Sequence, residues 1–159
     1  MPESFLPKTM IHRREETPAL WMLHLQLGPI GDGHAVPLDQ WSELSAEQQA
    51  TTGLVLQGHD ALETLDVDVS VAPVIALHFP KFADGRCYSH AYWLRRHLGY
   101  TRPIVAFGDV LRDQLPYMER SGIRTFYLRQ DQNTAGCIEQ LRHFTKHYQY
   151  NDAFQQLGA

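Results

Sequence analysis

The chain has little cysteine. Cys87 and Cys137 are the only two thiols in 159 residues, and they lie fifty positions apart. This spacing fits neither a disulfide framework nor a zinc knuckle, and two thiolates alone cannot hold an iron–sulfur cluster. No apolar run approaches the ~20 residues that cross a bilayer, and the first residues contain no apolar signal segment. We therefore expect a soluble protein of the reducing cytoplasm, without a membrane contact.

A surplus of positive charge is also missing. Lys and Arg number 14 against 18 Asp and Glu, which gives a net charge of −4. Nucleic acids and anionic membranes are bound by basic surfaces, so neither is an expected partner. With 43% hydrophobic and 20% charged residues, the composition is that of an ordinary globular protein. We expect one domain over residues 1–159, with a polar N-terminal segment, residues 1–19, that is ordered only in part.

Cofactor signatures are absent from the sequence. There is no G-x-G-x-x-G after a predicted strand, no Walker loop and no C-x-x-C pair, and the glycines of GPIGDG (28–33) lie in a predicted turn. Side chains alone cannot supply the electrons for a multi-electron reduction. The sequence therefore predicts no cofactor, and a flavin bound without a motif is an alternative that no residue pattern supports.

Short apolar runs alternate with helical segments over the C-terminal two thirds of the chain. This alternation, with short connections, predicts βα units and a mainly parallel α/β sheet. The expected strands are 54–57, 74–79, 104–107 and 125–128, and the expected helices are 87–99, 114–122 and 134–150.

The N-terminal third has a different pattern. WMLHLQL (21–27) alternates apolar and polar residues, GPIGDG (28–33) has turn composition, and HAVPL (34–38) can return as a second strand. These segments predict an antiparallel hairpin at one edge of the sheet. Asp39 or Ser42 is expected to cap a short helix that runs to Ala50.

Charged residues follow three of the expected strands, in PKFADGR, GDVLRDQ and RQDQ. The carboxyl ends of parallel strands are where open α/β sheets bind ligands, so these charges should form one rim. The rim has four cations, one of them Arg129, and four carboxylates, one of them Asp131. A sulfate or phosphate site should instead have more cations than carboxylates. A salt-bridged loop network is the simpler alternative. The candidate binding or docking residues are Lys81, Asp84, Arg86, Asp109, Arg112, Asp113 and Gln114, with no catalytic residue assigned.

Helix capping offers a structural role for two of these residues. Asp113 can cap a helix that begins at Gln114, and Asp84 can cap the helix that begins near Cys87. Capping does not account for Lys81 or Asp109, nor for Arg86, so these three are the strongest functional candidates.

Thiol and metal chemistry have structural alternatives too. Arg86 and a helix N-terminus could activate Cys87, but Cys87 shares an apolar helical stripe with Ala91 and Leu94, which predicts an inert buried thiol. His143 and His147 are four residues apart on the last helix, but they lie on its polar face, so we expect a solvated face and no metal site. His78 lies in an apolar strand and is expected to be a satisfied core histidine.

Two motifs resemble one bacterial family. FPKFADGRCYSHAYWLRRHLGY (79–100) and AFGDVLRDQLPYMERSGI (106–123) are similar to the family of domain of unknown function 934, with the match covering about residues 79–126. Members are often described as oxidoreductases involved in sulfite reduction, because their genes lie next to the gene of sulfite reductase. The chain departs from the pattern at Ala83, at Val105 in place of an arginine, and at Ser121 in place of a cysteine. The missing arginine weakens an anion site, and the missing cysteine argues against a shared redox thiol.

Three hypotheses follow. The first is an accessory protein of assimilatory sulfite reduction that uses the rim to bind a small metabolite or to dock a redox partner such as sulfite reductase. The second is an enzyme at the same strand ends, either a cofactor-dependent oxidoreductase or an acid–base catalyst using Asp109 and Lys81. The third is an interaction module, such as a homodimer joined through Trp21, Trp41 and Trp93.

Overall fold

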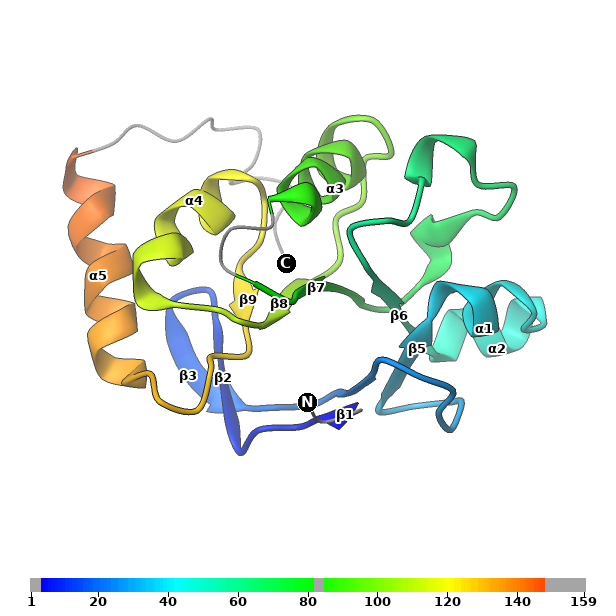
Figure 1. Cartoon of the computed structure of the whole chain (residues 1–159), viewed down its shortest axis with the longest axis horizontal. Coiled ribbons are helices and arrows are strands. Elements are labelled where there is room, and N and C mark those ends of the chain that lie inside the picture. The colour runs from blue at the N-terminus through cyan, green and yellow to red at the C-terminus, as the bar shows by residue number, and fades with distance from the viewer. Residues whose placement is uncertain (1–3, 82–84, 148–159) are drawn as a thin grey trace.

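The computed structural model describes residues 4–81 and 85–147, with the side chains described as far as residue 143. The chain forms one nine-stranded sheet with helices on one side and the first residues on the other (Figure 1). The strands are β1 (Ser4–Phe5), β2 (Thr9–His12), β3 (Glu15–Pro18), β4 (Met22–His24), β5 (His34–Pro37), β6 (Gly53–Leu56), β7 (Ile75–Phe79), β8 (Ile104–Gly108) and β9 (Thr125–Phe126). The helices are α1 (Leu38–Ser42), α2 (Ala46–Thr51), α3 (Arg86–Arg96), α4 (Leu115–Arg120) and α5 (Thr134–His147), with 3₁₀ turns at Leu62–Thr64, Val69–Val71 and Arg112–Gln114.

The sheet is mostly parallel, as the sequence predicted. Its strand order is β1-β4-β5-β6-β7-β8-β9-β2-β3, and every pair from β4 to β9 is parallel. Antiparallel pairs occur at the two ends of this order, where β1 joins β4 and the β2–β3 hairpin joins β9. The expected antiparallel hairpin at an edge is therefore present, although it is made by earlier residues than predicted.

The segments first expected to form that hairpin pair in parallel instead. Met22 lies opposite His34 and Leu23 opposite Ala35 in a parallel register. The connection between β4 and β5 is long enough to carry the chain back to the start of β4, and the backbone N–H of Met22 donates to the Gly33 carbonyl at 2.8 Å. The turn composition of GPIGDG was interpreted correctly, but a tight reversal was the wrong conclusion from it.

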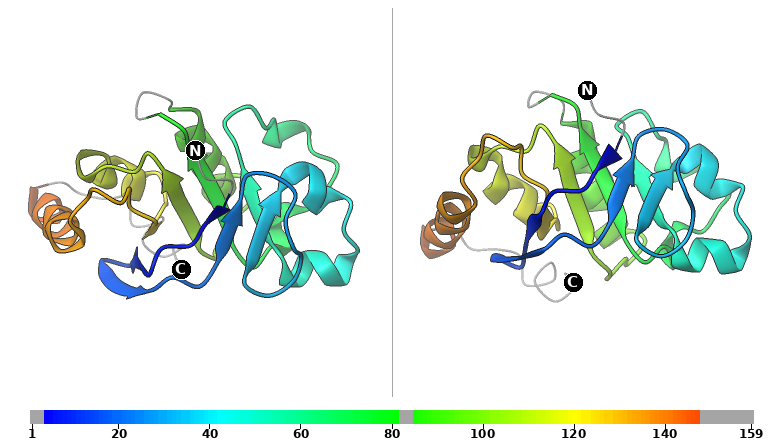
Figure 2. Two further views of the ribbon diagram at one scale, coloured as in Figure 1. Left: turned by 60° about the horizontal axis from the view of Figure 1, so that its bottom comes forward. Right: turned by 90° about the horizontal axis from the view of Figure 1, so that it is seen from below.

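A strong curl of the sheet follows from the position of β1. β1 and β2 lie seven strand positions apart in the sheet order, a path of about 34 Å at normal strand spacing. The chain from Phe5 to Thr9 can extend over only about 14 Å. The two ends of the sheet must therefore approach each other, and the first residues run across the concave side (Figure 2).

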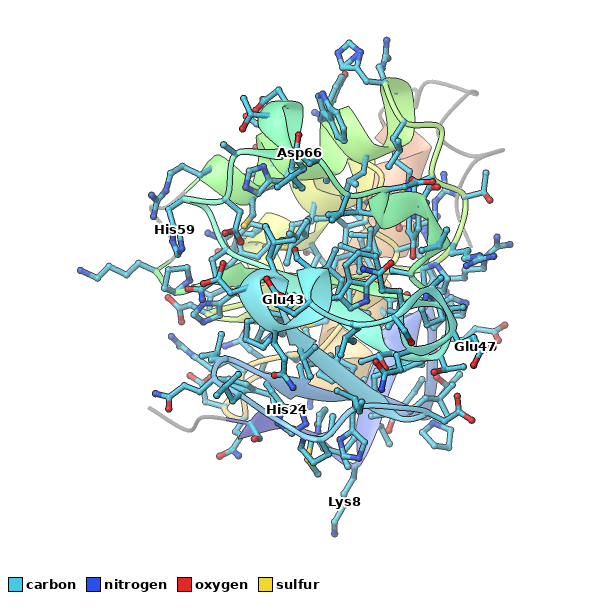
Figure 3. All side chains as sticks on the ribbon, turned by 90° about the vertical axis from the view of Figure 1, so that its right-hand side faces the viewer. Lys8, His24, Glu43, Glu47, His59 and Asp66 are labelled. Carbon is cyan, nitrogen blue, oxygen red and sulfur yellow. The ribbon has the colours of Figure 1, made fainter. Side chains whose placement is uncertain are left out.

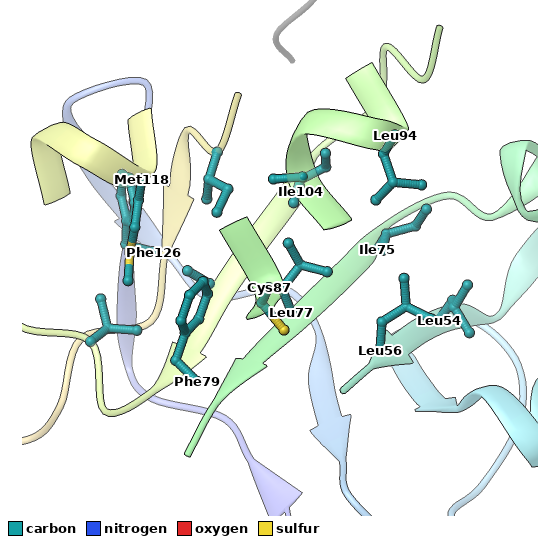
Figure 4. Close-up of a cluster of buried hydrophobic side chains, with 14 of the residues drawn as sticks. Leu54, Leu56, Ile75, Leu77, Phe79, Cys87, Leu94, Ile104, Met118 and Phe126 are labelled. Atoms are coloured by element: carbon teal, nitrogen blue, oxygen red, sulfur yellow. The ribbon is translucent and has the colours of Figure 1, made fainter. Parts of the chain in front are cut away.

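Side chains alternate between two cores. The convex face packs Leu54, Leu77 and Phe79 against buried helix residues such as Cys87 and Leu94 (Figure 4). The concave face forms a second, smaller apolar cluster. It contains Met10, Leu23, Ala35, Val55, Val74, Ala76, Val105, Phe107 and Tyr127, with Phe5, Ala19, Trp21 and Leu25 packed against it. Parallel strands buried on both faces account for the continuous apolar runs in the sequence.

Several helix boundaries differ from expectation. The single helix predicted up to Ala50 is two short helices, because Ser45 starts α2 with a capping box that includes Gln48. Trp41 of α1 is fully buried and donates its indole N–H to the Thr52 carbonyl at 2.9 Å, so it is a core residue and not an interface residue. The last helix begins at Thr134 as predicted, and the predicted residues after His147 lie outside the described part.

No helix in the described part of the chain is both long and apolar enough to cross a membrane.

Candidate functional site

The expected rim lies where three neighbouring strands end. In the sheet, β8 lies between β7 and β9, with Phe79 opposite Gly108 and Ala106 opposite Phe126. The backbone N–H of Asp109 donates to the Phe79 carbonyl at 2.7 Å, and that of Arg129 donates to the Val110 carbonyl at 3.3 Å. The backbone thus links the ends of β7, β8 and β9 at one edge.

Arg129 forms an ion cluster with two carboxylates at this edge. Its Nη1 lies 2.7 Å from Asp109 Oδ1, while its Nε and Nη2 lie 2.6 Å and 2.7 Å from the two oxygens of Asp131. The bidentate hydrogen bonds of Arg129 lower the pKa of Asp131 to about 2, and both carboxylates raise the pKa of Arg129. The guanidinium is therefore already occupied by carboxylates of the chain itself.

This cluster is a poor site for a small oxyanion. Two carboxylates against one guanidinium leave one negative charge on the cluster. A sulfite or phosphate ion would have to displace a bidentate carboxylate, which is the strongest geometry for an arginine pair. The cation surplus that an oxyanion site needs is therefore absent from these three side chains.

A cavity of about 550 Å³ opens beside the cluster. One wall is residues 4–7, and the opposite wall is residues 127–131 after β9, with Gly108 at the end of β8 also lining the space. Apolar side chains dominate the walls, and Arg129 and Asp131 contribute their charges. A volume of this size is typical of a small-molecule site, and the end of a parallel strand is its usual place.

Phe5, which lines this cavity, packs against two further rings. The Phe5 ring packs edge-on against Phe107 with centroids 5.1 Å apart, and His78 lies 5.0 Å from Phe107 and 6.3 Å from Phe5. Gly108 follows Phe107, and a Cβ atom at Gly108 would lie 2.5 Å from the Phe79 carbonyl oxygen and 3.0 Å from the His78 ring. Glycine therefore permits the close approach of β7 and β8 at the cavity.

The structure distributes the seven predicted rim residues widely. Asp109 is in the ion cluster. Lys81 is exposed just beyond β7, and Asp84 lies outside the described residues. Arg86 is the first residue of α3, and its side chain lies against Gly58 in the loop after β6.

The remaining three predicted residues lie in the 3₁₀ turn before α4. The backbone N–H of Arg112 donates to Gln132 at 3.0 Å, and its guanidinium donates to Gln140 at 3.4 Å. Asp113 was expected to cap α4, but the turn continues through Gln114 and α4 has no side-chain cap. The capping interpretation of Asp113 is therefore wrong, because α4 begins at Leu115, one residue later than predicted, and Gln114 occupies its N-cap position.

The position of Val105 does not lie at the rim. The family pattern has an arginine there, and we expected the loss of this arginine to weaken an anion site. Val105 is instead 1% exposed and belongs to the apolar cluster of the concave face. The position is in the middle of β8, so its side chain points to the interior and not to the strand end.

The sequence reasoning missed one whole wall of the cavity. Residues 4–7 (SFLP) carry neither charge nor motif, and their position depends on long-range pairing of Ser4 with His24 and of Phe5 with Leu23. No local pattern could have placed them at the ends of β8 and β9.

Two other predictions about reactive groups can be assessed. Cys87 is 2% exposed and its thiol donates to the His78 carbonyl at 3.2 Å, which confirms a buried thiol on the core-facing side of α3. Glu139 and His143 are exposed, as expected for a solvated face. Among the described residues, no group of three His, Cys, Asp or Glu side chains could hold a metal ion.

Comparison with known proteins identifies a family. A family model described as "Bacterial protein of unknown function (DUF934)" matches residues 53–156, from β6 to beyond α5. No curated protein and no solved structure matches the chain.

Proposed function

The chain belongs to the DUF934 family of bacterial proteins, and we propose that it is an accessory protein that binds a small metabolite in the cavity between residues 4–7 and the ends of β8 and β9. The observation that carries this proposal is the cavity itself, about 550 Å³ with mainly apolar walls. Ligand sites in α/β proteins are of this size and occupy this end of the sheet. The family resemblance suggests assimilatory sulfite reduction as the setting.

The charges of the site restrict the ligand. The three side chains of the Asp109–Arg129–Asp131 cluster carry a formal charge of −1, and the guanidinium already donates to both carboxylates. A ligand with an apolar or aromatic body and a neutral or cationic polar end fits such a site. Free sulfite fits neither the charge nor the volume. A role in sulfite reduction would therefore involve an organic metabolite in this cavity.

A pair of leucine variants tests the proposal. Leu6 and Leu27 are both exposed, at 50% and 84%, but only Leu6 is among the residues that line this cavity. We expect the neutral dye N-phenyl-1-naphthylamine to bind the wild type and Leu27→Asp with enhanced fluorescence. Leu6→Asp should bind it at least ~10-fold more weakly, because an apolar ligand would have to remove water from the new carboxylate without replacing its hydrogen bonds. Sodium sulfite should not displace the dye. Equal binding by both variants would refute this cavity as the site.

Docking of a redox partner is a second candidate function, and the exposure of the ion cluster favours it. The side chains of Arg129 and Asp131 are 45% and 58% exposed. Mixed charges at a surface set the register of a protein complex more than its affinity. If the cluster docks on sulfite reductase, Asp131→Lys should abolish the salt-sensitive part of binding in an interferometry assay, whereas Asp66→Lys in a distant loop should not. Identical binding curves for the two variants would exclude docking through this cluster.

A further inference from the structure

Three side chains near one cavity wall form a continuous hydrogen-bonded chain. Ser4 Oγ lies 2.9 Å from His24 Nδ1, and His24 Nε2 lies 3.0 Å from His34 Nδ1. Ser4 is exposed and lines the cavity, whereas His24 is 5% exposed. A serine hydrogen-bonded to a buried imidazole, which a third residue orients, is the arrangement that activates serine nucleophiles.

The fold holds the central imidazole in a fixed position. Ser4 and His24 are directly paired across the antiparallel β1–β4 ladder, so their side chains lie on the same face. His34 comes from the start of β5, and its ring stacks on that of His24 with centroids 5.2 Å apart. Figure 3 shows this side of the molecule, with His24 below Glu43, which follows α1, and below Glu47 of α2.

The loop after β4 closes over the same ring. A Cβ atom on Gly28 would lie 2.6 Å from His24 Cγ, so the Gly28 backbone packs directly on the imidazole. Gln40 of α1 fixes this loop by accepting from the Gly28 N–H at 3.0 Å and donating to the Gly28 carbonyl at 2.6 Å. Among the residues that the structure describes, Ser4 and His34 hydrogen-bond to His24 and Gly28 packs on its ring, and none of these three is a carboxylate.

The chain of hydrogen bonds can accept one proton without breaking. With His24 neutral and protonated on Nε2, the Ser4 hydroxyl donates to Nδ1 and the Nε2–H donates to His34 Nδ1. When His24 takes the serine proton, both of its nitrogens become donors, and Ser4 Oγ and His34 Nδ1 can still accept. Burial, followed by the electrostatic effect of the neighbouring His34 ring, lowers the pKa of His24, so its base form is present at neutral pH.

We propose that Ser4 is the nucleophile of an acyl-transfer reaction, with His24 as its general base and His34 as the residue that positions His24. The inference rests on the proposed function, because the substrate would occupy the same cavity. The apolar walls select an ester or thioester of an apolar acyl group, in keeping with the unfavourable charge for oxyanions.

The reaction balances without another reactant besides water. Ser4 Oγ forms a bond to the acyl carbon and transfers its proton to His24 Nδ1. The bond to the alcohol or thiol breaks, and the leaving group takes that proton. Water then attacks the acyl-serine with His24 again as base, which releases the acid and restores Ser4.

A fluorophosphonate probe tests this inference on the full-length chain. Attack by Ser4 forms a P–O bond and expels fluoride, and intact-protein and peptide mass spectrometry locate the adduct. We expect one adduct at Ser4, none in Ser4→Ala, and unchanged labelling in Ser70→Ala, a serine whose hydroxyl bonds to Asp68 and not to an imidazole. The labelling rate should rise with pH with an apparent pKa below 6.5.

Variants of His34 separate positioning from mere stability. His34→Ala should slow labelling ~10-fold or more, because the neutral and charged forms of His24 lose their acceptor. His34→Asn keeps an acceptor oxygen near the position of Nδ1 and should restore most of the rate. A melting temperature measured for each variant shows whether it is folded, and Ser4→Ala gives a second comparison if a His34 variant is not.

The outcomes distinguish this inference from the proposed function. No adduct, an adduct at another serine, or a rate independent of pH between 5 and 8 overturns the role of Ser4. If the neutral dye still binds the wild type and is lost in Leu6→Asp, the cavity remains a ligand site without acyl transfer. If the dye does not bind and no adduct forms, both proposals are wrong.

Discussion

Gly108 provides the sharpest test of how the fold shapes the cavity. It lines the cavity at the end of β8 with a φ angle of +100°. A methyl group there would lie 2.5 Å from the Phe79 carbonyl oxygen, which is fixed because it accepts the Asp109 N–H at 2.7 Å. Gly108→Ala therefore adds a backbone clash to an unfavourable backbone angle.

Gly31 is the matched control. Its φ angle is +109°, but an added Cβ would meet no atom within 4 Å. Both alanine variants carry the conformational strain, about 1–3 kcal/mol for an L-residue in a sparsely populated region. Only Gly108→Ala carries the overpacking term, about 1–3 kcal/mol. We expect Gly108→Ala to be less stable than Gly31→Ala by that second amount.

Urea unfolding followed by tryptophan fluorescence measures the difference, since the chain has three tryptophans. In a chain of this length, each kcal/mol also lowers the melting temperature by roughly 2–4 °C. Equal free energies of unfolding for the two variants would show that β7 and β8 do not approach as closely as described. A loss in Gly31→Ala alone would contradict the assignment of open space around that turn.

Three further predictions concern buried or paired side chains. Arg95→Lys should lower the free energy of unfolding by about 2–3 kcal/mol, because the buried guanidinium donates to three backbone carbonyls at 2.7–2.9 Å. Arg96→Lys on the exposed face should change the free energy of unfolding by under about 0.5 kcal/mol. Equal losses in the two variants would refute a stabilising role of the Arg95 hydrogen bonds. In an NMR titration the Asp131 carboxyl should have a pKa of about 2, and this pKa should rise toward 3.8 in Arg129→Ala. The ion pair therefore stabilises the fold fully above about pH 4, and this stabilisation is lost as the pH falls toward about 2. An unchanged pKa in Arg129→Ala would contradict the pairing. Tyr127→Phe should cost about 1–3 kcal/mol, since its hydroxyl exchanges two hydrogen bonds with the backbone between β3 and β4, and burial raises the pKa of Tyr127 to about 12, which ultraviolet titration can check.

Local sequence patterns predicted the elements whose own residues determine them. The apolar runs at 54–57, 74–79, 104–107 and 125–128 overlap β6, β7, β8 and β9, and the apolar stripe that includes Cys87 lies in α3. The strands are buried on both faces and therefore appear as continuous apolar runs. Helix α3 is buried on one face, and its apolar residues therefore recur at helical spacing. The mostly parallel sheet could be predicted for the same reason.

The N-terminal third could not be predicted in this way. β1 has two residues and β4 has three, and both depend on partners far away in the sequence. Parallel pairing of β4 with β5 leaves the same alternation in the sequence as an antiparallel hairpin would. Asp109 and its partner Arg129 follow neighbouring strands, which is the kind of proximity that a parallel sheet makes predictable. The capping role of Asp113 could not be predicted, because a 3₁₀ turn displaces the start of α4.

Only one of the two walls of the cavity lies in the part of the chain that the family model covers. The family model covers residues 53–156, which include Gly108 and the ion-paired loop after β9, but not residues 4–7, His24 or His34. The shared part supplies the strand ends and the fixed charges, and the N-terminal part supplies the facing apolar wall and the Ser4–His24–His34 chain. The strand ends and the Ser4–His24–His34 chain thus lie in different segments. Under the proposals above, substitutions in the N-terminal residues alone can change which ligand the cavity takes. Exchange of residues 1–38 between two family members should therefore transfer dye binding and probe labelling together, and labelling that follows residues 53–156 instead would place the reactive group elsewhere.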